Sequence, residues 1–370
     1  MMRVVIGCGG TGGHIMPAIA IADIIRTRCE RAEILFIGSQ GGMEEKLIPQ
    51  AGYAIRTLPA TGFTRRVSAS NIKAAYLAVR SSAAAAVWLD SLRPDIVIGT
   101  GGYASYPALR AAIRRGIPAV VHESNAVAGL AVRHLSRRLD RVWLNFDAAR
   151  ETLSRGASVL TVGNPLPRGY ERPIPASLPA GKKYMILSFG GSRGASALNH
   201  AVLSLMEWEK ERSDIYHVHA TGEREYEAFC KQMEIRGLSR RMQYRVVPFL
   251  SPMAHYMAAA DVVICRAGAM SISELAALSK AAVLIPSPNV TGDHQYRNAK
   301  ALADKGAALL LQESEMTSTS LRDLVFPLLA CKEKRHALES AIHVFHHPTA
   351  NDEIYADICR LCMKKSRETV

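Results

Sequence analysis

Long apolar runs are missing from this sequence: no stretch approaches the roughly 18 to 20 residues that a helix needs to cross a bilayer. The chain opens as a strand near Arg3, and not with the apolar segment of a secretory signal peptide. The seven cysteines are odd in number and scattered, and only Cys359 and Cys362 have a CxxC spacing, without a second pair. A disulfide framework or a zinc site is therefore not expected. These absences predict a cytosolic protein without a membrane span.

Aromatic and acidic residues are also scarce. Aromatics make up 6% of the 370 residues, and 33 Asp and Glu stand against 46 Lys and Arg, a formal net charge of +13. Such a charge favours polyanions or an anionic membrane surface. No zinc-finger spacing and no aromatic RNA-binding strand motif is present, so nucleic acid is not expected as the partner. The P-loop pattern GxxxxGK[ST] is missing too, which argues against ATP hydrolysis.

Glycines are abundant where short β-branched runs end. Gly9-Gly10-Thr11-Gly12-Gly13-His14 follows the run from Arg3 to Ile6, Gly101-Gly102-Tyr103 follows Asp95 to Ile98, and Gly190-Gly191-Ser192-Arg193-Gly194 follows Met185 to Phe189. A strand, a glycine turn and a helix start present backbone N–H groups to an anion, usually a phosphate. The first and third turns lie about half a chain apart. We therefore expect two similar halves that face a shared cleft.

Length and element order give the expected architecture. A chain of 370 residues predicts about two domains. Short strands alternate with helical stretches, which is typical of a doubly wound parallel α/β sheet. The proline-rich stretch from Asn164 to Pro179 is the expected linker. In the first half, we predict a helix that begins near Pro17, because proline suits a first helical turn. Strands are expected at the following ranges: Val4–Ile6, Glu33–Ile37, Ile96–Ile98, Ala119–Val121, Val159–Val162, Tyr184–Phe189, Ile215–His219, Gln243–Val247, Val262–Cys265 and Ala282–Ile285.

The first glycine turn also satisfies the dinucleotide pattern GxGxxG, through Gly7, Gly9 and Gly12. A dinucleotide site needs an acidic residue at the end of the next strand, to bind the ribose hydroxyls. That strand ends in Ile37-Gly38-Ser39, without a carboxylate. A nicotinamide or flavin enzyme is therefore the less favoured interpretation.

A second helix start follows the run from Val262 to Cys265. Its segment from Arg266 to Glu274 predicts a helix from about Ala269, whose N-terminus could bind a diphosphate while Glu274 accepts ribose hydroxyls. The alternative is structural, since Ser271 and Glu274 could form a capping box for the helix itself. Downstream, polar residues from Ser287 to Asn298 follow the next strand, where open α/β sheets bind ligands.

A basic and apolar segment runs from Phe63 to Arg93. It mixes apolar side chains with arginines and lysines, in the manner of a surface that lies on lipid headgroups. An ordinary core-packed helix with a solvated basic face is the alternative. The residues concerned are Phe63, Ile72, Tyr76, Leu77, Val79 and Trp88 among Arg65, Arg66, Lys73, Arg80 and Arg93.

Seven motifs together resemble the MurG family of peptidoglycan N-acetylglucosaminyltransferases. To the three glycine turns and the segment from Arg266 to Glu274 they add His122-Glu123-Ser124-Asn125, Val162-Gly163-Asn164-Pro165 and Asp293-His294-Gln295, in the family's order and approximate spacing. The resemblance spans nearly the whole chain. It implies an α/β protein of the GT-B class, with two Rossmann-like domains facing a cleft. Residues 1–164 would bind the acceptor and dock on the membrane, residues 165–348 would bind the donor, and a last helix at about 349–370 would pack back on the first domain.

The implied reaction moves N-acetylglucosamine from UDP-N-acetylglucosamine to the 4-hydroxyl of the muramyl sugar in undecaprenyl-diphospho-muramoyl-pentapeptide (lipid I), with inversion. No DxD motif occurs, so no metal and no cofactor are expected. By resemblance Ser192 contacts the diphosphate, Leu250 the uracil and Glu274 the ribose, while His294 and Gln295 read the sugar. Arg168 stands one position late for the family arginine that positions the uracil. The implied donor set also includes Thr11, Gly12, Gly13, Asn125, Ala269, Met270, Ser271, Ile272 and Ser273.

For the acceptor, the resemblance implies a diphosphate site made by Gly12, Gly13, Gly101, Gly102 and Tyr103. His14 is the expected base, because it lies on the first glycine turn and ionises near neutral pH. Glu123 is the alternative base. His122 is either part of the site or a packed histidine at a strand end.

The resemblance also implies the partners and the location. A lipid-linked acceptor needs a protein that docks peripherally on the cytoplasmic face of the inner membrane, on its anionic leaflet, with the segment from Phe63 to Arg93 as the membrane face. Other cell-wall synthesis proteins are further expected partners, with roles in cell shape and division. A diacylglycerol glycosyltransferase, a UDP-sugar epimerase and a non-catalytic nucleotide-binding module are the rival interpretations.

Overall fold

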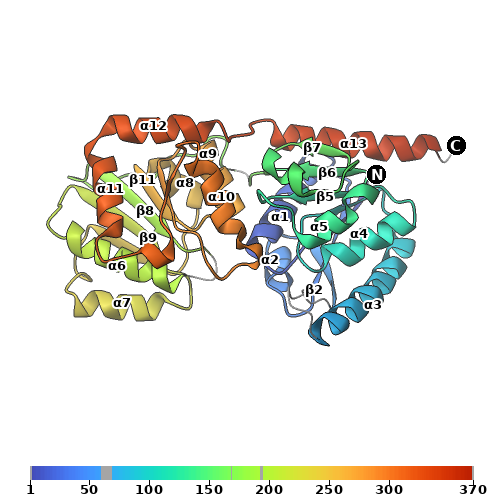
Figure 1. The fold of residues 1–370 in the computed structure, drawn as a ribbon, viewed down its shortest axis with the longest axis horizontal. Helices are drawn as coiled ribbons and strands as arrows, with labels where there is room; N and C mark the ends of the chain where they lie inside the picture. Colours follow the sequence, from blue (N-terminus) through green and yellow to red (C-terminus); the bar gives the residue numbers. More distant parts are fainter. Residues whose placement is uncertain (1, 60–68, 168, 192–194, 369–370) are drawn as a thin grey trace. The chain divides into compact units, whose positions relative to one another are not determined.

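The computed structural model describes residues 2–59, 69–167, 169–191 and 195–368. These residues form two compact units, one made of residues 1–167 with 347–370 and the other of residues 168–346 (Figure 1). The boundaries expected from the sequence, at 164/165 and 348/349, lie a few residues from these. Between β7, which ends at Thr161, and β8, which begins at Tyr184, the described residues form no helix or strand.

The first unit is built on a parallel sheet that, within the described residues, has seven strands in the order β3-β2-β1-β4-β5-β6-β7. Because β1 and β4 are central neighbours, chain connections run outward from them in both directions. The strands are β1 (Arg3–Gly7), β2 (Glu33–Ser39), β3 (Ala54–Leu58), β4 (Ile96–Gly99), β5 (Ala119–Glu123), β6 (Arg141–Leu144) and β7 (Val159–Thr161).

Helices cover both faces of this sheet. One face packs against α1 and α13 through a core that includes Ile21, Ile25, Ile354 and Ile358. The other face packs against α3, α4 and α5. The helices are α1 (Gly12–Arg28), α2 (Glu44–Gln50), α3 (Ala69–Leu92), α4 (Ser105–Arg114), α5 (Leu130–Leu135) and α13 (Ala350–Glu368), with 3-10 turns η1 (Ser136–Arg138) and η2 (Asp147–Thr152).

Helix α1 begins earlier than expected. Its first residue is Gly12, whereas the sequence predicts a start near Pro17, and this prediction is wrong. Pro17 lies inside the helix, where its missing N–H leaves the carbonyl of Gly13 without the usual partner. The glycine turn is consequently shorter than expected, and His14 belongs to the first turn of α1.

The second unit repeats the plan of the first. Its parallel sheet has, among the described residues, six strands in the order β10-β9-β8-β11-β12-β13, and α6, α7 and α11 pack on one face. The strands are β8 (Tyr184–Phe189), β9 (Ile215–Ala220), β10 (Tyr244–Val247), β11 (Val262–Cys265), β12 (Ala282–Leu284) and β13 (Leu309–Leu310). The remaining elements are α6 (Ser196–Glu209), α7 (Tyr226–Ile235), α8 (Met253–Ala259), α9 (Ala269–Ala277), α10 (His294–Ala303), α11 (Ser320–Ala330), α12 (Lys332–His343), η3 (Thr291–Asp293) and η4 (Glu313–Glu315).

Counted from its own first strand, the second sheet has the Rossmann strand order 3-2-1-4-5-6, and the first sheet has the same order with a seventh strand added at its edge. The expectation of two Rossmann-like, doubly wound domains is therefore confirmed. In such sheets ligands bind outside the carboxyl ends of the strands, where the order reverses. That point lies between β1 and β4 in the first unit and between β8 and β11 in the second.

The last helix, α13, belongs to the first unit although it is the last element of the chain. Its Asp357 is buried and accepts hydrogen bonds from the indole N–H of Trp143, at 2.8 Å, and from Arg141, at 3.1 Å. Ile354, Ile358 and Leu361 complete the core around α1. The helix thus covers a sheet face of the first unit with both apolar and polar contacts.

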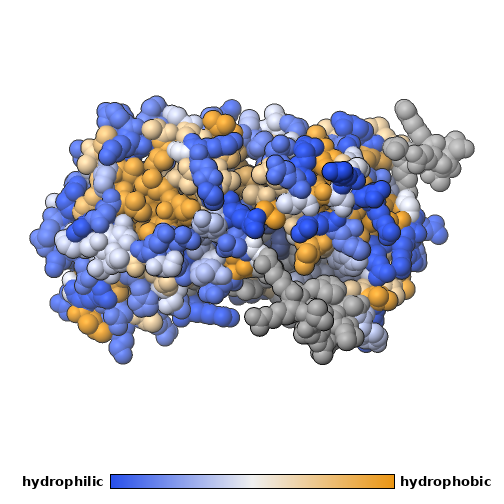
Figure 2. Space-filling view, viewed as in Figure 1, coloured by the Kyte–Doolittle hydropathy of each residue, from blue (hydrophilic) through white to orange (hydrophobic). Residues whose placement is uncertain are grey.

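The molecular surface is mixed. On the face seen in Figure 2, hydrophilic residues surround separate groups of exposed apolar side chains. None of the helices in the described part of the chain is long and apolar enough to cross a membrane.

Candidate functional site

In the first unit, the turns that follow β1 and β4 lie side by side, because Gly7 pairs with Gly99 in the sheet. A side chain at Gly102 would overlap the backbone carbonyl of Gly9. Gly101 has φ of +98°, a conformation that side-chain-bearing residues rarely adopt. The glycines therefore let two turns pack directly on each other at the point where the strand order reverses.

His14 is held by the β4 turn. Its Nδ1 lies 3.0 Å from the carbonyl oxygen of Thr100, and the Thr100 hydroxyl donates to the His14 carbonyl at 2.7 Å. A carbonyl only accepts, so Nδ1 carries the proton of the neutral ring and Nε2 is the basic nitrogen. A methyl group at Gly101 would overlap the ring at Nδ1. The structure therefore brings His14, Gly101 and Gly102 together, as the sequence predicts.

The N-terminus of α1 is not capped by its own side chains. Thr11 is the N-cap residue in extended conformation, without a side-chain capping bond, and the first turn has no acidic residue. The first N–H groups of a helix have no intrahelical acceptor, so those of Gly12 and Gly13 are suited to an anion. Tyr103, about half exposed, lies near Gly10. The residues predicted for the acceptor diphosphate therefore lie at or near the start of α1.

His122 is a packed histidine. It is fully buried, Nε2 donates to the carbonyl of Gly163 at 2.9 Å, and Nδ1 lies 3.3 Å from the hydroxyl of Ser124. Burial is the main cause that lowers the pKa of His122 to about 4; the hydrogen bond to Gly163 opposes this shift, and charge on His14 contributes to it. His122 is therefore neutral near pH 7 and does not repel a proton on His14.

Glu123 organises the loop after β5. One carboxylate oxygen accepts from the backbone N–H of Asn125 at 3.0 Å and from its side-chain amide at 3.1 Å. The other accepts from the N–H of Gly129 at 2.8 Å. Burial raises the pKa of Glu123, and these hydrogen bonds oppose the rise. Glu123 thus fixes Asn125 and the loop that carries it.

In the second unit the turns after β8 and β11 are neighbours, because Phe189 pairs with Cys265. Helix α9 begins at Ala269 after Gly268, which is the N-cap residue in extended conformation without a side-chain capping bond. The alternative of a capping box by Ser271 and Glu274 is therefore wrong, because Gly268 and not Ser271 is the N-cap residue. A helix start of this kind is the type of element that binds an anion. The predicted Ala269, Met270, Ile272 and Ser273 are mostly buried, and Ser271 is half-buried.

Glu274 lies one turn inside α9 and is hydrogen-bonded by the hydroxyl of Tyr170. Burial raises the pKa of Glu274 to about 7, and the Tyr170 hydrogen bond opposes the rise. Tyr170 is itself buried. The predicted ribose ligand is thus a carboxylate that titrates near neutral pH and is held from the segment before β8.

Arg266 connects the loop that follows β12 to η4. It forms an ion pair with Glu313 and donates to the carbonyls of Ile285 and Pro286 at 3.2 and 3.3 Å. Gln295, a predicted sugar ligand, accepts from the N–H of Ser287 at 2.8 Å through Oε1. The loop after β12 is therefore fixed by both residues.

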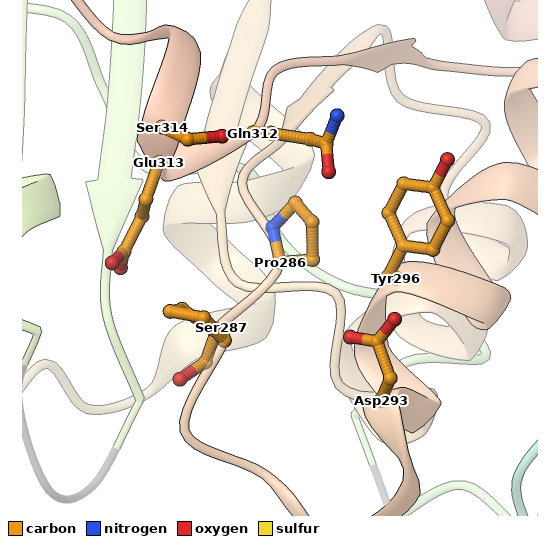
Figure 3. Close-up of a pocket in the computed structure, with 8 residues that line it drawn as sticks. Pro286, Ser287, Asp293, Tyr296, Gln312, Glu313 and Ser314 are labelled. Atoms are coloured by element: carbon orange, nitrogen blue, oxygen red, sulfur yellow. The ribbon is translucent and has the colours of Figure 1, made fainter.

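A cavity of about 380 Å³ lies between this loop, the start of α10 and η4. Figure 3 shows Tyr296 and Asp293 on one side of it, Glu313 and Ser287 on the other, and the Gln312 amide reaching toward Tyr296. It adjoins the predicted sugar ligands His294 and Gln295. The full lining is Pro286, Ser287, Pro288, Asp293, Tyr296, Gln312, Glu313 and Ser314.

The structure describes one of the three remaining donor residues predicted from the sequence. Leu250 is buried in the loop after β10, at the same sheet edge. Arg168 and Ser192 lie outside the described residues. Among the described side chains, no group of three or more His, Cys, Asp or Glu could hold a metal ion.

Helix α3 carries the described part of the basic and apolar segment. Tyr76, Val79 and Val87 are 63%, 55% and 65% exposed, on one helix face with the exposed Arg80. Trp88 instead packs against the core, with the Arg56 guanidinium 5.4 Å from its ring centroid, so its expected place on the membrane face is wrong. Phe63, Arg65 and Arg66, and the side chains of Ile72 and Lys73, lie outside the described residues.

Sequence reasoning missed three residues of these sites: Thr100, Tyr170 and Glu44. Glu44 is the first residue of α2. Its carboxylate lies under the first glycine turn and binds the N–H of Ser39 at the end of β2, where no carboxylate was expected. The only sequence feature that could have identified Glu44 is its place after Gly41-Gly42. An acidic residue in that place is equally typical of an ordinary helix start. Thr100 and Tyr170 carry no recognisable pattern.

Comparison with known proteins assigns the family. Residues 4–144 match the glycosyltransferase family 28 N-terminal domain, and residues 185–354 match the C-terminal domain of the same family. The UDP-N-acetylglucosamine--N-acetylmuramyl-(pentapeptide) pyrophosphoryl-undecaprenol N-acetylglucosamine transferase of Desulforudis audaxviator is 36% identical over 374 residues, which cover 99% of this chain and 100% of the relative. The protein of the same name from Halalkalibacterium halodurans is 35% identical over 359 residues, covering 96% of this chain and 98% of the relative.

A solved structure agrees with these relatives. The crystal structure of Acinetobacter baumannii MurG is 30% identical, has a TM-score of 0.75, and the match covers 97% of this chain and 100% of that one. The resemblance to MurG that the motifs indicate is thereby confirmed. This chain belongs to glycosyltransferase family 28 and, within it, to the MurG family.

Proposed function

We propose that this protein transfers N-acetylglucosamine from UDP-N-acetylglucosamine to the muramyl 4-hydroxyl of lipid I, with inversion at the anomeric carbon, in peptidoglycan synthesis. The names of its full-length relatives support this substrate pair. The observation that carries the proposal is that α1 and α9, at the two strand-order switch points, both begin without a side-chain cap. Each unit can therefore bind one diphosphate.

The second unit binds the donor. The N–H groups at the start of α9 and the positive end of its dipole neutralise the diphosphate, with Ser192 as a further contact. Glu274 accepts the ribose hydroxyls, and Leu250 contacts the uracil, with Arg168 near it. His294 and Gln295 read the sugar. As the bond to UDP breaks, these amides stabilise the charge that develops on the leaving diphosphate.

The first unit binds the acceptor and supplies the base. Gly12, Gly13 and the turn from Gly101 to Tyr103 contact the lipid diphosphate. Nε2 of His14 takes the proton of the muramyl 4-hydroxyl while its oxygen attacks the anomeric carbon. The tautomer fixed by Thr100 and the neutral state of His122 support this role. Glu123 is the less suitable base, since both of its oxygens already accept backbone N–H groups.

The exposed face of α3 docks on the membrane that holds lipid I. Its apolar side chains Tyr76, Val79 and Val87 enter the headgroup region while Arg80 and the net charge of +13 favour anionic lipids. The protein would then be peripheral on the cytoplasmic face of the inner membrane, where other cell-wall synthesis proteins are available as partners.

The test is a transfer assay with alternative acceptors. The purified protein is incubated with labelled UDP-N-acetylglucosamine and either lipid I, diacylglycerol or no acceptor. Label in lipid I alone is expected. Transfer to diacylglycerol would identify a lipid glycosyltransferase, and epimerised UDP-sugar without an acceptor would identify an epimerase. Nucleotide binding without any product would identify a non-catalytic module.

A further inference from the structure

Glu44, in the first turn of α2, has a carboxylate that the reaction described above does not use. The side chain is completely buried. Oε1 accepts from the backbone N–H of Ser39 at 2.8 Å, and Oε2 accepts from the N–H of Gly10 at 3.1 Å. The carboxylate therefore joins the end of β2 to the glycine turn that leads into α1.

Three glycines make room for this carboxylate. A methyl group at Gly9 or Gly42 would overlap its oxygens, and one at Gly38 would overlap its Cγ. These glycines come from the first turn, the end of β2 and the segment before α2. Close packing from three segments leaves the side chain little freedom, so both oxygens have defined positions under the turn.

Burying a carboxylate is costly unless the charge is compensated. No described Lys, Arg or His forms an ion pair with Glu44, and its carboxylate accepts from the backbone N–H groups of Ser39 and Gly10. Its charge adds to burial, the larger cause, in raising the pKa of the Cys8 thiol at the start of the turn. An apolar side chain would fill this space at a lower free-energy cost, which indicates that the negative charge has a role in the glycine turn.

We propose that Glu44 is a positioning residue for the acceptor diphosphate. By accepting the Gly10 N–H it occupies one amide of the turn with a negative charge, so a phosphate is repelled from that end. The anion is thereby directed to the N–H groups of Gly12 and Gly13 at the start of α1, next to His14. This inference rests on the proposed function, since it assigns the acceptor to the first unit.

Two variants displace the carboxylate in different ways. Glu44→Gln keeps the size but removes the charge and points one N–H group at a backbone donor. Gly42→Ala keeps the charge but pushes the carboxylate with a methyl group. Glu45→Gln is the matched control, because Glu45 is exposed in the same helical turn and loses the same charge.

The readouts are the KM for a short-chain lipid I analogue, the KM for UDP-N-acetylglucosamine, and the Kd for a polyprenyl diphosphate without sugar. We expect Glu44→Gln and Gly42→Ala to raise the acceptor KM and the polyprenyl diphosphate Kd about tenfold, or about 1.4 kcal/mol. The donor KM should not change in either variant. The control Glu45→Gln should change none of the three constants. An unchanged acceptor KM in folded variants, or an equal rise in the donor KM, would overturn the inference. If Glu44→Gln does not fold, Gly42→Ala decides.

The binding measurement separates this inference from the proposed function. Wild-type protein that makes no product on lipid I refutes the proposed function. The Kd for the polyprenyl diphosphate still reads the effect of Glu44, and equal binding by the wild type and both variants refutes the positioning role.

Discussion

His14 and Thr100 are joined by two hydrogen bonds that run in opposite directions. The His14 ring N–H donates to the Thr100 carbonyl at 3.0 Å, and the Thr100 hydroxyl donates to the His14 carbonyl at 2.7 Å. The pair connects the first turn of α1 to the end of β4, across the central strands of the first sheet. It fixes both the orientation and the tautomer of the ring, which is what a general base requires.

Replacing His14 by alanine should therefore reduce kcat by about 100-fold or more, since general base catalysis contributes roughly 10²- to 10⁴-fold. The affinity for UDP-N-acetylglucosamine should stay the same, because His14 is not among the donor contacts proposed for this chain. Steady-state kinetics and calorimetric titration of the donor measure both. His336→Ala is the control, as this side chain is 76% exposed on α12. A variant that keeps its turnover would remove His14 from the chemistry.

Gly101→Ala should harm both activity and stability. The new methyl group would overlap the His14 ring, in addition to the strain of φ near +98°. Gly116→Ala is the matched control, because Gly116 also has positive φ, +62°, but nothing lies within 4 Å of its missing side chain. We expect about 1 kcal/mol of destabilisation for the control and more for Gly101→Ala, with a loss of kcat only in the latter. Urea unfolding and turnover distinguish the two, and equal effects would argue against the packing of Gly101 on His14.

Tyr170→Phe should change the pH dependence of donor binding. In the proposed donor complex, ionised Glu274 accepts two ribose hydroxyls and the protonated form accepts fewer, so donor affinity should fall as the pH drops through about 7. The Tyr170 hydroxyl stabilises the ionised form, and its removal should raise the pKa of Glu274. The rise of the donor KM at low pH should then begin at a higher pH, while kcat at saturating donor changes little.

Tyr226→Phe is the control for this experiment, since Tyr226 lies on α7 and is not part of the site. The KM for UDP-N-acetylglucosamine is measured between about pH 5.5 and about pH 8.5. This range includes pKa values that are known for buried carboxyl groups. A rise of the donor KM that begins at the same pH in both variants and the wild type would show that Tyr170 does not act on Glu274.

The membrane face proposed for α3 can be tested with lipid vesicles. Val79→Asp with Val87→Asp should weaken binding to anionic vesicles strongly, because both side chains are exposed and each change replaces apolar contact with negative charge. Val344→Asp is the control, as Val344 is 77% exposed in the second unit. Flotation with anionic and neutral vesicles at moderate salt measures the effect. Equal binding of the wild type to both kinds of vesicle would contradict the electrostatic part of the proposal.

Most strands of both units could be predicted from the sequence. Tyr184–Phe189 and Val262–Cys265 have the predicted bounds, since both are short, mainly apolar runs that end at a glycine turn or an arginine. Strands β3, β6 and β13 were not predicted. They have five, four and two residues, and sheet pairing more than local pattern defines them.

The site was predictable where one local segment carries both the turn and the functional group. The glycine turns, His14 and the start of α9 satisfy this condition. Glu44, Thr100 and Tyr170 do not, because each acts on a residue at least 34 positions away, 86 for Thr100 and His14. Only the folded sheet brings such pairs together. The wrong start of α1 has a local cause, since Gly12 and Gly13 have low helix propensity and are held there by the turn.

The stereochemistry of the product tests the central claim most directly. Nuclear magnetic resonance of the disaccharide released after incubation with UDP-N-acetylglucosamine and lipid I gives both the linkage and the anomeric configuration. A single displacement with His14 as base predicts a β-linked sugar on the muramyl 4-oxygen, because the donor sugar is α-linked to UDP. An α-linked product, a different acceptor oxygen, or free N-acetylglucosamine without a disaccharide would contradict the account.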